Sequence, residues 1–386
     1  MKISILTPDI SSNGFGRAWL LAKLLQSQYD IEIIGPAFNN GIWQPLAKSC
    51  NFETKVVEGF ENGKCELKKI LTLITGDVIY ASKPLMTSFG VGLFAKIIKK
   101  KPLVLDIDDY ELGFGKDFYD LLPWYKKLND FRLSVKSWNS YYYKLILNRF
   151  IFLANSITVS GELLQRKYGG TIIWHVRDIG KFDPNNFDQN KLRRIYLPKQ
   201  YRNTFIIGFI GTPRPHKGLD DLLEALRILK GKHILLFIMG MRDDEYAVSF
   251  KLKVESTGLN HMVHLVPAQP FENLPEILSF IDLVVIPQRR KPASFGQIPA
   301  KIFDAMAMGK AIVATEVFEI PEILNDCGFI VKPEDPEQLA RTIQYVASHP
   351  QEAKEMGAKA REKCEKLYST ELMKEKLTAI FERLMR

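Results

Sequence analysis

Short apolar runs alternate with longer amphipathic segments along the first half of this chain. An apolar run of roughly four to eight residues between loops is typical of a strand buried on both faces of a parallel sheet. Strands are predicted at residues 2–7, 31–35, 77–81, 102–107 and 156–160, and helices at 18–26, 91–98 and 161–168. This alternation predicts a doubly wound α/β domain, in which ligands bind beyond the carboxyl ends of the strands.

The same alternation returns in the second half, after a polar stretch with the composition of a linker. Strands are predicted at residues 204–210, 233–240, 263–265, 283–287 and 311–314, and helices at 219–229, 243–257, 338–347 and 351–386, the last one broken near 368–370. We therefore expect two α/β domains, which agrees with a length of 386 residues. The expected boundaries are 1–185 for the first domain, 186–202 for the linker, 203–368 for the second domain and 369–386 for a closing helix.

The composition of the chain indicates the cellular compartment more clearly than it indicates any chemical reaction. No apolar run reaches the roughly 18 residues that span a bilayer, and the first predicted strand meets Pro8 too early for a secretory signal. We therefore expect a cytoplasmic protein. The cysteines, at positions 50, 65, 327 and 364, show no CxxC spacing, so neither a zinc site nor a disulfide framework is supported. The net charge of +9 is spread over both halves and permits an anionic partner without requiring one.

Residues 121–150 have an unusual composition, in which lysines and arginines are interleaved with tryptophans and tyrosines. An amphipathic helix packed on its own sheet fits this composition best. A helix at a membrane surface comes second, and base stacking with a nucleic acid comes last. We therefore expect no nucleic-acid partner, and peripheral contact of residues 121–150 with the inner face of the membrane remains the alternative.

A glycine-containing loop follows the first predicted strand. Gly14, Phe15 and Gly16 precede Arg17 and a predicted helix, which is the layout of a phosphate-binding loop in a doubly wound domain. The loop lacks the third glycine of the dinucleotide fingerprint, so the sequence does not favour NAD. It is either a flexible segment that contacts a ligand or a tight turn.

Acidic residues cluster after the strand at 102–107. Asp106, Asp108 and Asp109 would lie near Lys83 at the carboxyl edge of the sheet, where ligands bind. Carboxylates this close together suit a metal site or a catalytic base. Alternatively, Asp106 or Asp108 caps a turn and the others are solvated. Asp108 is our candidate for a catalytic carboxylate, and we assign no metal site.

A stiff loop follows the first strand of the second half. Gly211 and Gly218 bracket the loop, and two prolines restrict its backbone. Arg214 and Lys217 would be held at the carboxyl end of that strand, where a guanidinium and an ammonium suit a diphosphate. The alternative is that both charges are solvated at the surface.

Residues 294–315 are predicted to form a loop, a helix that stops at Gly309, and a buried strand. Gly296 would let a phosphate approach the backbone. Neither Gln297 nor Ile298 is a good helix cap, so the first N–H groups of the helix need another partner, such as an anion.

Lys301 and Asp304 are three residues apart and share one face of this predicted helix. A cation for a phosphate and a carboxylate for ribose hydroxyls would suit a nucleoside diphosphate. An ordinary helix with a solvated lysine and a solvated aspartate is the alternative.

Three segments resemble motifs of a known enzyme family. Residues 211–225, GTPRPHKGLDDLLEA, resemble the G-R-x-x-x-x-K-G segment of GT-B glycosyltransferases, especially family 4 (glycosyl transferases group 1). Residues 303–315, FDAMAMGKAIVAT, are similar to the family's E-A-M-A-x-G-x-P-V-V-A-T. Residues 175–184, HVRDIGKFDP, resemble N-G-V-D-x-x-x-F-x-P. The glycine loop at residues 14–16 and the closing helices fit the family as well, so the resemblance covers essentially the whole chain.

The resemblance implies the GT-B fold, in which two Rossmann-like, doubly wound parallel-sheet domains face a cleft and the C-terminal helix crosses back to the first domain. It implies a retaining glycosyltransferase that moves a hexose from a nucleoside diphosphate sugar to a hydroxyl of a glycan, lipid-linked saccharide or small acceptor. The donor would bind mainly to the second domain and the acceptor to the first. The resemblance implies neither a metal nor a cofactor.

The site residues of the family carry over by position. Arg214 and Lys217 match the diphosphate-binding pair, and Asp304 matches the second glutamate of the paired-glutamate motif, which is expected on the ribose. The resemblance and the residue chemistry together give two sets of expected site residues. The donor-binding set is Gly14, Phe15, Gly16, Gly211, Gly296, Gln297, Ile298, Lys301 and Asp304, and the catalytic set is Arg214, Lys217 and Asp108.

This chain departs from the family pattern at several of these positions. Gly296 stands where the family usually has its first glutamate, although a variant with P-x-K in this place would let Lys301 contact a phosphate. Asp304 is one methylene shorter than the usual glutamate, and residues 106–109 stand where a histidine is often found. Two other functions remain open: a non-hydrolysing nucleotide-sugar epimerase, and a degenerate relative that binds a nucleotide or a partner protein.

Overall fold

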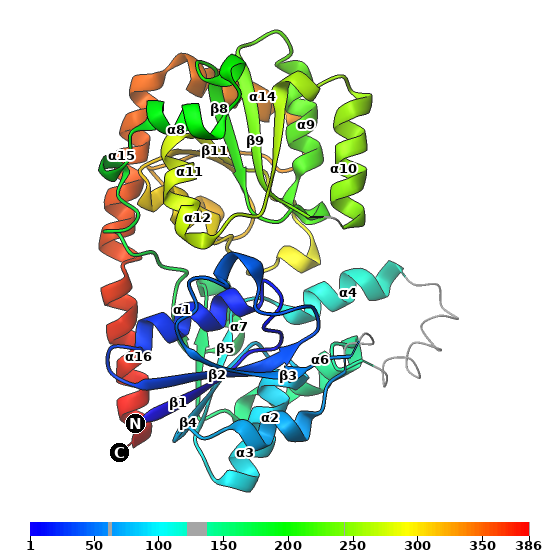
Figure 1. The fold of residues 1–386 in the computed structure, drawn as a ribbon, viewed down its shortest axis with the longest axis vertical. Coiled ribbons are helices and arrows are strands. Elements are labelled where there is room, and N and C mark those ends of the chain that lie inside the picture. The colour runs from blue at the N-terminus through cyan, green and yellow to red at the C-terminus, as the bar shows by residue number, and fades with distance from the viewer. Residues whose placement is uncertain (61–63, 122–136, 243, 386) are drawn as a thin grey trace. The chain divides into compact units, whose positions relative to one another are not determined.

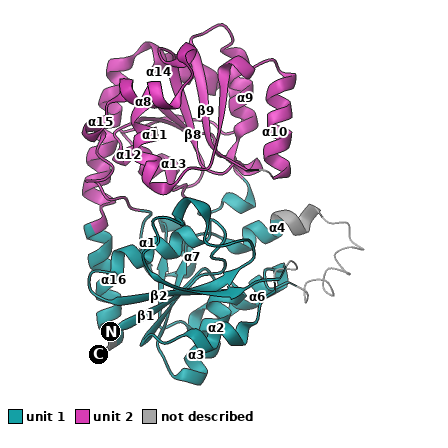
Figure 2. Ribbon diagram, viewed as in Figure 1, with its two compact units in different colours: residues 1–175, 291–297, 371–386 teal, residues 176–290, 298–370 magenta. Residues whose placement is uncertain are grey.

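The computed structural model describes residues 1–60, 64–121, 137–242 and 244–385. It divides into two compact units. Unit 1 consists of residues 1–175, 291–297 and 371–386, and unit 2 of residues 176–290 and 298–370 (Figure 2). Two α/β domains were predicted from the pattern of strands and helices. Each unit contains one parallel sheet with helices packed against it, which confirms the predicted fold class.

Unit 1 is built on a sheet that has seven strands among the described residues, in the order β3-β2-β1-β4-β5-β6-β7, all parallel. The strands are β1 (Lys2–Leu6), β2 (Asp30–Ala37), β3 (Glu53–Glu58), β4 (Val78–Ser82), β5 (Leu103–Ile107), β6 (Ser156–Val159) and β7 (Thr171–Ile172). The helices are α1 (Phe15–Leu25), α2 (Leu67–Leu73), α3 (Val91–Lys99), α4 (Glu111–Leu121), α6 (Tyr141–Arg149), α7 (Glu162–Tyr168) and α16 (Thr370–Met385). Short helical turns are η1 (Gln44–Leu46), η2 (Met86–Gly90), η3 (Ile151–Leu153) and η9 (Pro292–Ser294).

The central strands of unit 1 are apolar because helices cover both faces of the sheet. Every residue of β4 and of β5 is buried. Figure 1 shows α2 and α3 on one face of the sheet and α1 and α16 on the other. Apolar side chains of α2, α3, α6 and α7 join those of the strands in one core cluster. This two-sided burial explains why the strands were recognisable as continuous apolar runs.

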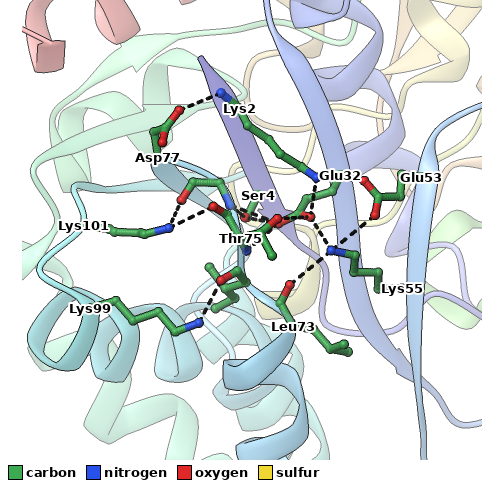
Figure 3. A network of polar contacts seen from close by, with 12 residues as sticks. Lys2, Ser4, Glu32, Glu53, Lys55, Leu73, Thr75, Asp77, Lys99 and Lys101 are labelled. Carbon is green, nitrogen blue, oxygen red and sulfur yellow. Dashed lines mark hydrogen bonds and ion pairs between the residues drawn. The ribbon is translucent and has the colours of Figure 1, made fainter.

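A buried carboxylate joins the amino-terminal halves of neighbouring strands in unit 1 (Figure 3). Glu32 of β2 lies beside Ser4 of β1 in the sheet register and accepts hydrogen bonds from Thr75 N (2.8 Å) and Thr75 Oγ1 (2.7 Å). The ammonium of Lys55 on β3 lies 2.6 Å from the same carboxylate. Burial disfavours the charged form, but these donors outweigh it and hold the pKa of Glu32 well below its usual range. The network thereby fixes the loop that precedes β4.

Unit 2 is built on a sheet that has six strands among the described residues, in the order β10-β9-β8-β11-β12-β13, all parallel. The strands are β8 (Phe205–Ile210), β9 (Ile234–Met241), β10 (Val263–Pro267), β11 (Leu283–Ile286), β12 (Ala311–Thr315) and β13 (Phe329–Val331). The helices are α8 (Gln189–Tyr196), α9 (Leu219–Ile228), α10 (Glu245–Ser256), α11 (Leu274–Phe280), α12 (Lys301–Ala307), α13 (Ile320–Ile323), α14 (Pro336–Ser348) and α15 (Pro350–Leu367). Short helical turns are η4 (Pro184–Asn186), η5 (Lys199–Tyr201), η6 (Pro215–Lys217), η7 (Asn260–Met262) and η8 (Phe271–Asn273).

Gly309 ends α12 in the left-handed conformation, with φ +60°, as the sequence predicted. The start of this helix differs slightly from the prediction. Pro299 suits the first position of a helix, where its missing N–H removes no bond, yet it precedes this helix, which begins at Lys301. The strand that follows, β12, is buried along its whole length.

Residues 186–202 have a linker composition but are ordered within unit 2. They contain α8, and the guanidinium of Arg193 donates to both carboxylate oxygens of Asp282 at 2.7 Å. Leu192 and Leu197 are buried. Buried side chains and the Arg193–Asp282 ion pair therefore help to fix a segment whose composition is mostly polar.

The closing helices divide between the two units. Helix α15 belongs to unit 2, whereas α16 from residue 371 onward belongs to unit 1. In α16, Met373, Leu377 and Phe381 are fully buried, and the Phe381 ring lies 5.5 Å from the Tyr80 ring of β4. The end of the chain therefore completes the core of the unit that contains its beginning.

None of the described helices is both long enough and apolar enough to cross a lipid bilayer. The amphipathic segment at residues 121–150 lies partly outside the described residues, because 122–136 are not among them. Most of its described part forms α6, in which Leu147 is buried and Ile146 is exposed.

Candidate functional site

The loop after β8 is held tightly against its surroundings in unit 2. Gly211 and Gly218 both have positive φ, +126° and +70°. A Cβ atom at Gly218 would lie 1.7 Å from the Pro287 carbonyl oxygen, so only glycine fits without backbone movement. A Cβ atom at Gly240, at the end of β9, would lie 2.6 Å from the Gly211 carbonyl carbon. The loop that carries Arg214 and Lys217 is therefore tightly constrained.

Arg214 and Lys217 lie on this loop beyond the carboxyl end of β8, where the sequence placed them. The Arg214 guanidinium is partly exposed and forms an ion pair with Asp244 at 2.9 Å. Asp244 also caps α10 by accepting a hydrogen bond from Ala247 N. The Lys217 ammonium donates to the Thr212 carbonyl oxygen at 3.1 Å.

Lys301 brings a further cation to the same strand end. Its side chain is buried, and its ammonium lies 3.5 Å from the centroid of the Phe209 ring of β8. Burial and the nearby positive charge of Lys217 hold the pKa of Lys301 well below its usual range, although Asp304 opposes them. An anion between these two lysines would relieve their repulsion and favour the charged form of Lys301.

Asp304 lies one helical turn from Lys301 and is also buried. Its carboxylate forms an ion pair with Arg177, and the net effect of burial against this partner is a raised pKa. The Arg177 guanidinium lies 5.4 Å from the centroid of the Phe271 ring. Sequence reasoning did not assign a role to Arg177, although it lies within the motif-like segment 175–184. A role for Asp304 on a ribose remains a prediction.

In unit 1, Asp106 forms a buried ion pair with Arg17, the residue that follows the glycine loop. Arg17 donates to both Asp106 carboxylate oxygens at 2.9 Å, and both side chains are almost completely buried. Arg17 also donates to the Ile173 carbonyl oxygen at 2.7 Å, and Thr158 donates to Asp106 at 2.7 Å. Asp106 is therefore neither a turn cap nor a solvated carboxylate.

The other carboxylates of this segment surround Lys83, which the sequence placed at the same edge of the sheet. The Lys83 ammonium lies 3.0 Å from Asp108 and 3.2 Å from Glu111, and it also hydrogen bonds to Asp109. Gln297 donates a hydrogen bond to Asp109 at 3.0 Å. The participation of Glu111 was not predicted from the sequence.

The pKa values of Asp108 and Asp109 are shifted in opposite directions. Burial raises the pKa of Asp108 to about 7, although Lys83 opposes this rise. Burial also disfavours the Asp109 carboxylate, but its hydrogen bonds and the charge of Lys83 outweigh burial and lower its pKa to about 2. A carboxyl group with a pKa near 7 suits proton transfer at neutral pH. Asp108 is therefore a better candidate for acid/base chemistry than Asp109.

The glycine loop of unit 1 is a tight turn in geometry. The N–H groups of Phe15 and Gly16 donate to the carbonyl oxygens of Ser12 and Asn13, both at 3.1 Å. The Phe15 side chain is fully buried, so only its backbone is available to a ligand. A contact between this loop and a donor phosphate remains a prediction.

The predicted donor-binding residues fall in both units. Gly296 and Gln297 belong to unit 1, and Gly296 has φ +63°, which favours glycine. Ile298, Lys301 and Asp304 belong to unit 2, and the Ile298 side chain is buried. Among the residues that the structure describes, no group of three or more His, Cys, Asp or Glu side chains is arranged to hold a metal ion.

Comparison with known proteins agrees with this architecture. Residues 193–363, which lie within unit 2 apart from 291–297, match the family described as glycosyl transferases group 1. The chain is 22% identical over 333 residues to the capsular polysaccharide biosynthesis glycosyltransferase CapM of Staphylococcus aureus, covering 82% of this chain and 80% of that protein. It is 24% identical over 164 residues to the D-rhamnosyltransferase WbpZ of Pseudomonas aeruginosa, covering 42% of this chain and 41% of that protein.

Solved structures show the same fold. The crystal structure of Anabaena HepE in complex with UDP-glucose superposes with a TM-score of 0.77 at 19% identity, covering 99% of this chain and 100% of that chain. The chain therefore has the GT-B fold of two Rossmann-like domains, and the group 1 match over residues 193–363 supports a glycosyltransferase.

Proposed function

We propose that this protein is a retaining glycosyltransferase that moves a hexose from a nucleoside diphosphate sugar to a hydroxyl of a glycan, lipid-linked saccharide or small acceptor. The relatives support this substrate class. HepE was crystallised with UDP-glucose, and CapM is named for capsular polysaccharide biosynthesis. Retention of anomeric configuration and independence of a metal ion are parts of the proposal that rest on the sequence resemblance.

The observation that carries the proposal is the group of cations beyond β8 in unit 2. Burial and the positive charge of nearby Lys217 together lower the pKa of Lys301, and Arg214 lies on the same constrained loop as Lys217. Bringing like charges together costs free energy unless an anion offsets them. A diphosphate would supply that anion and would accept the hydrogen bonds of the guanidinium and the ammonium groups.

In the proposed reaction, the bond between the anomeric carbon and the diphosphate oxygen breaks while the acceptor hydroxyl oxygen bonds to the same carbon on the face that the diphosphate leaves, so the configuration is retained. The departing diphosphate gains negative charge, which Arg214, Lys217 and Lys301 stabilise. Asp108 takes the proton of the acceptor hydroxyl in its ionised form, which suits its pKa of about 7. Asp304 is proposed to bind the ribose with its free carboxylate lone pairs.

Replacing Lys217 tests this proposal. Lys217→Ala should lower kcat by about 100-fold or more, since it removes a donor that acts on the developing charge. It should also reduce the rise in melting temperature that the preferred sugar nucleotide produces, in a panel of UDP-, GDP- and ADP-sugars. Lys230→Ala is the matched control, because Lys230 is an exposed lysine on the same unit.

Wild-type turnover in the Lys217→Ala variant would overturn the assignment of the diphosphate site. If no sugar nucleotide raises the melting temperature of the wild-type protein, the donor class itself is wrong. Release of free nucleoside diphosphate only when an acceptor is present separates a transferase from an epimerase and from a protein that merely binds nucleotide.

A further inference from the structure

Helix α3 of unit 1 has two apolar faces, and only one of them is covered. Val91 and Ala95 are buried in the core cluster of the unit. Phe94, Ile97 and Ile98 follow the spacing of a helix face that normally packs on a core, yet all three are exposed, Ile97 at 72%. Exposed side chains this large and this close together mark a contact surface more often than an ordinary solvated face.

A second element extends this apolar face. Turn η3 follows α6, and its residues Phe152 and Leu153 are exposed, Phe152 at 72%. The Lys96 ammonium of α3 donates to the Leu153 carbonyl oxygen at 2.6 Å, which places η3 beside α3. We name the resulting set the α3–η3 surface. It comprises Phe94, Ile97, Ile98, Phe150, Phe152 and Leu153.

The two segments that form the α3–η3 surface carry only positive charge. Segments 91–101 and 141–153 contain lysines and arginines but neither aspartate nor glutamate. Lys100 and Arg149 are exposed at the ends of α3 and α6. Lys99 and Lys101 donate to carbonyl oxygens of the loop 73–77 (Figure 3). Their ammonium groups are therefore held near the C-terminal end of α3.

We propose that the α3–η3 surface binds the face of an anionic lipid bilayer, with its phenylalanine and isoleucine side chains inserted among the lipids and its cations on the headgroups. Apolar insertion combined with cationic contact is the combination that gives peripheral proteins stable membrane binding. A second copy of this chain fits less well. A symmetric pair would bring the same cations of both copies together, and neither segment offers a carboxylate to offset them.

The experiment is sedimentation of the 386-residue protein with lipid vesicles. Phosphatidylcholine vesicles containing roughly one-third phosphatidylglycerol should pellet the wild-type protein, whereas pure phosphatidylcholine vesicles should not. Raising the salt concentration from about 0.1 M to about 0.5 M should weaken the binding without abolishing it, because salt screens only the cationic contribution.

Two double variants separate the apolar contribution of the α3–η3 surface to vesicle binding from its cationic contribution. Ile97→Ser with Ile98→Ser should reduce the partition coefficient at least tenfold, and Lys100→Gln with Arg149→Gln should reduce the salt dependence. Ile195→Ser in unit 2 is the matched control, because Ile195 is 63% exposed and Ile98 is 64% exposed. Melting temperatures of all variants verify that each of them is folded.

Equal binding of the wild type and the Ile97→Ser, Ile98→Ser variant would overturn the proposal, as would the absence of binding to anionic vesicles. A wild-type dimer in lipid-free sedimentation equilibrium that the same variant dissociates would assign the surface to a second copy instead. This proposal does not depend on the proposed transferase activity, since vesicle binding is measured without any sugar nucleotide.

Discussion

The carboxylates around Lys83 show how neighbouring residues of one type acquire different chemistry. Asp109 accepts hydrogen bonds from Lys83 and Gln297, and these stabilise its charged form. Glu111 has Lys144 as a second cation at 3.0 Å, and its pKa is lowered. Asp108 has the same ammonium at 3.0 Å but remains dominated by burial. Proton affinity therefore differs among adjacent residues because their partners differ.

Asp108 should make the protein less stable as the pH rises from about 4 to about 7. Its pKa of about 7 in the folded state is above the usual 3.8, so in this window the folded state holds a proton that the unfolded state has released. The free energy of unfolding should therefore fall across this window, by about 1.4 kcal/mol for each unit by which the folded-state pKa exceeds that of the unfolded chain. The lowered pKa of Asp109, about 2, acts only at lower pH.

Urea unfolding of the wild type and of Asp108→Asn at several pH values measures this contribution. The variant should show a smaller fall in stability across the window, because its amide does not titrate. Asp109 interacts with Asp108, so the comparison is made above about pH 4, where the lowered pKa of Asp109 keeps it ionised in the folded state of both proteins. Parallel curves for the two proteins would contradict the raised pKa of Asp108.

At the scale of elements, a close contact between two backbone segments fixes the loop that carries Arg214 and Lys217. Gly218 is the residue before α9 and has the left-handed φ of +70°. Its neighbour across the fold is the Pro287 carbonyl oxygen, just beyond β11. The loop with Arg214 and Lys217 is therefore confined where it meets the start of α9, next to the residue that follows β11.

Gly218→Ala should destabilise the protein by about 2 kcal/mol or more beyond the cost of Gly258→Ala. Both glycines have nearly the same positive φ, +70° and +68°, so both substitutions carry a similar conformational cost of about 1 kcal/mol. Only at Gly218 does the added Cβ collide with backbone, whereas no atom lies within 4 Å at Gly258. Urea unfolding of the two variants measures the difference, and equal losses would argue against the close approach.

At the scale of the whole molecule, the chain returns at its end to the unit in which it began. Helix α16 packs on the sheet of unit 1, and Thr378 Oγ1 donates to Gln28 Oε1 at 2.6 Å. Phe381 lies against Tyr29 as well as Tyr80, with ring centroids 5.8 Å and 5.5 Å apart. Unit 1 is therefore incomplete without the last helix.

Phe381→Ala should lower the stability of unit 1 by about 3–5 kcal/mol, because it removes a fully buried aromatic side chain and leaves a cavity. Hydrogen exchange measured by mass spectrometry should show faster exchange in β1 and β4 but unchanged exchange in β8 and β9. Leu367→Ala is the control, because Leu367 is an exposed residue of α15 and its loss should change stability by only about 0.5 kcal/mol. Unchanged exchange in β4 would mean that α16 does not support unit 1.

The sequence by itself determined the two parallel-sheet domains, the glycine that ends α12, and the position of Arg214 and Lys217 beyond β8. These features can be recognised in the local sequence, because a strand buried on both faces is apolar throughout and a position with left-handed backbone favours glycine. It also placed Lys83 near Asp108 and Asp109, since carboxyl ends of parallel strands meet at one edge of the sheet.

Only the tertiary structure decided the partners of the buried charges and the exposure of apolar faces. Arg17 pairs with Asp106, and Arg177 with Asp304, across many residues of sequence that no local pattern connects. Phe15 and Ile97 look alike in an amphipathic pattern, yet the first is fully buried and the second is exposed. Spacing along a helix shows which residues share a face, but what covers that face depends on segments far away in the chain.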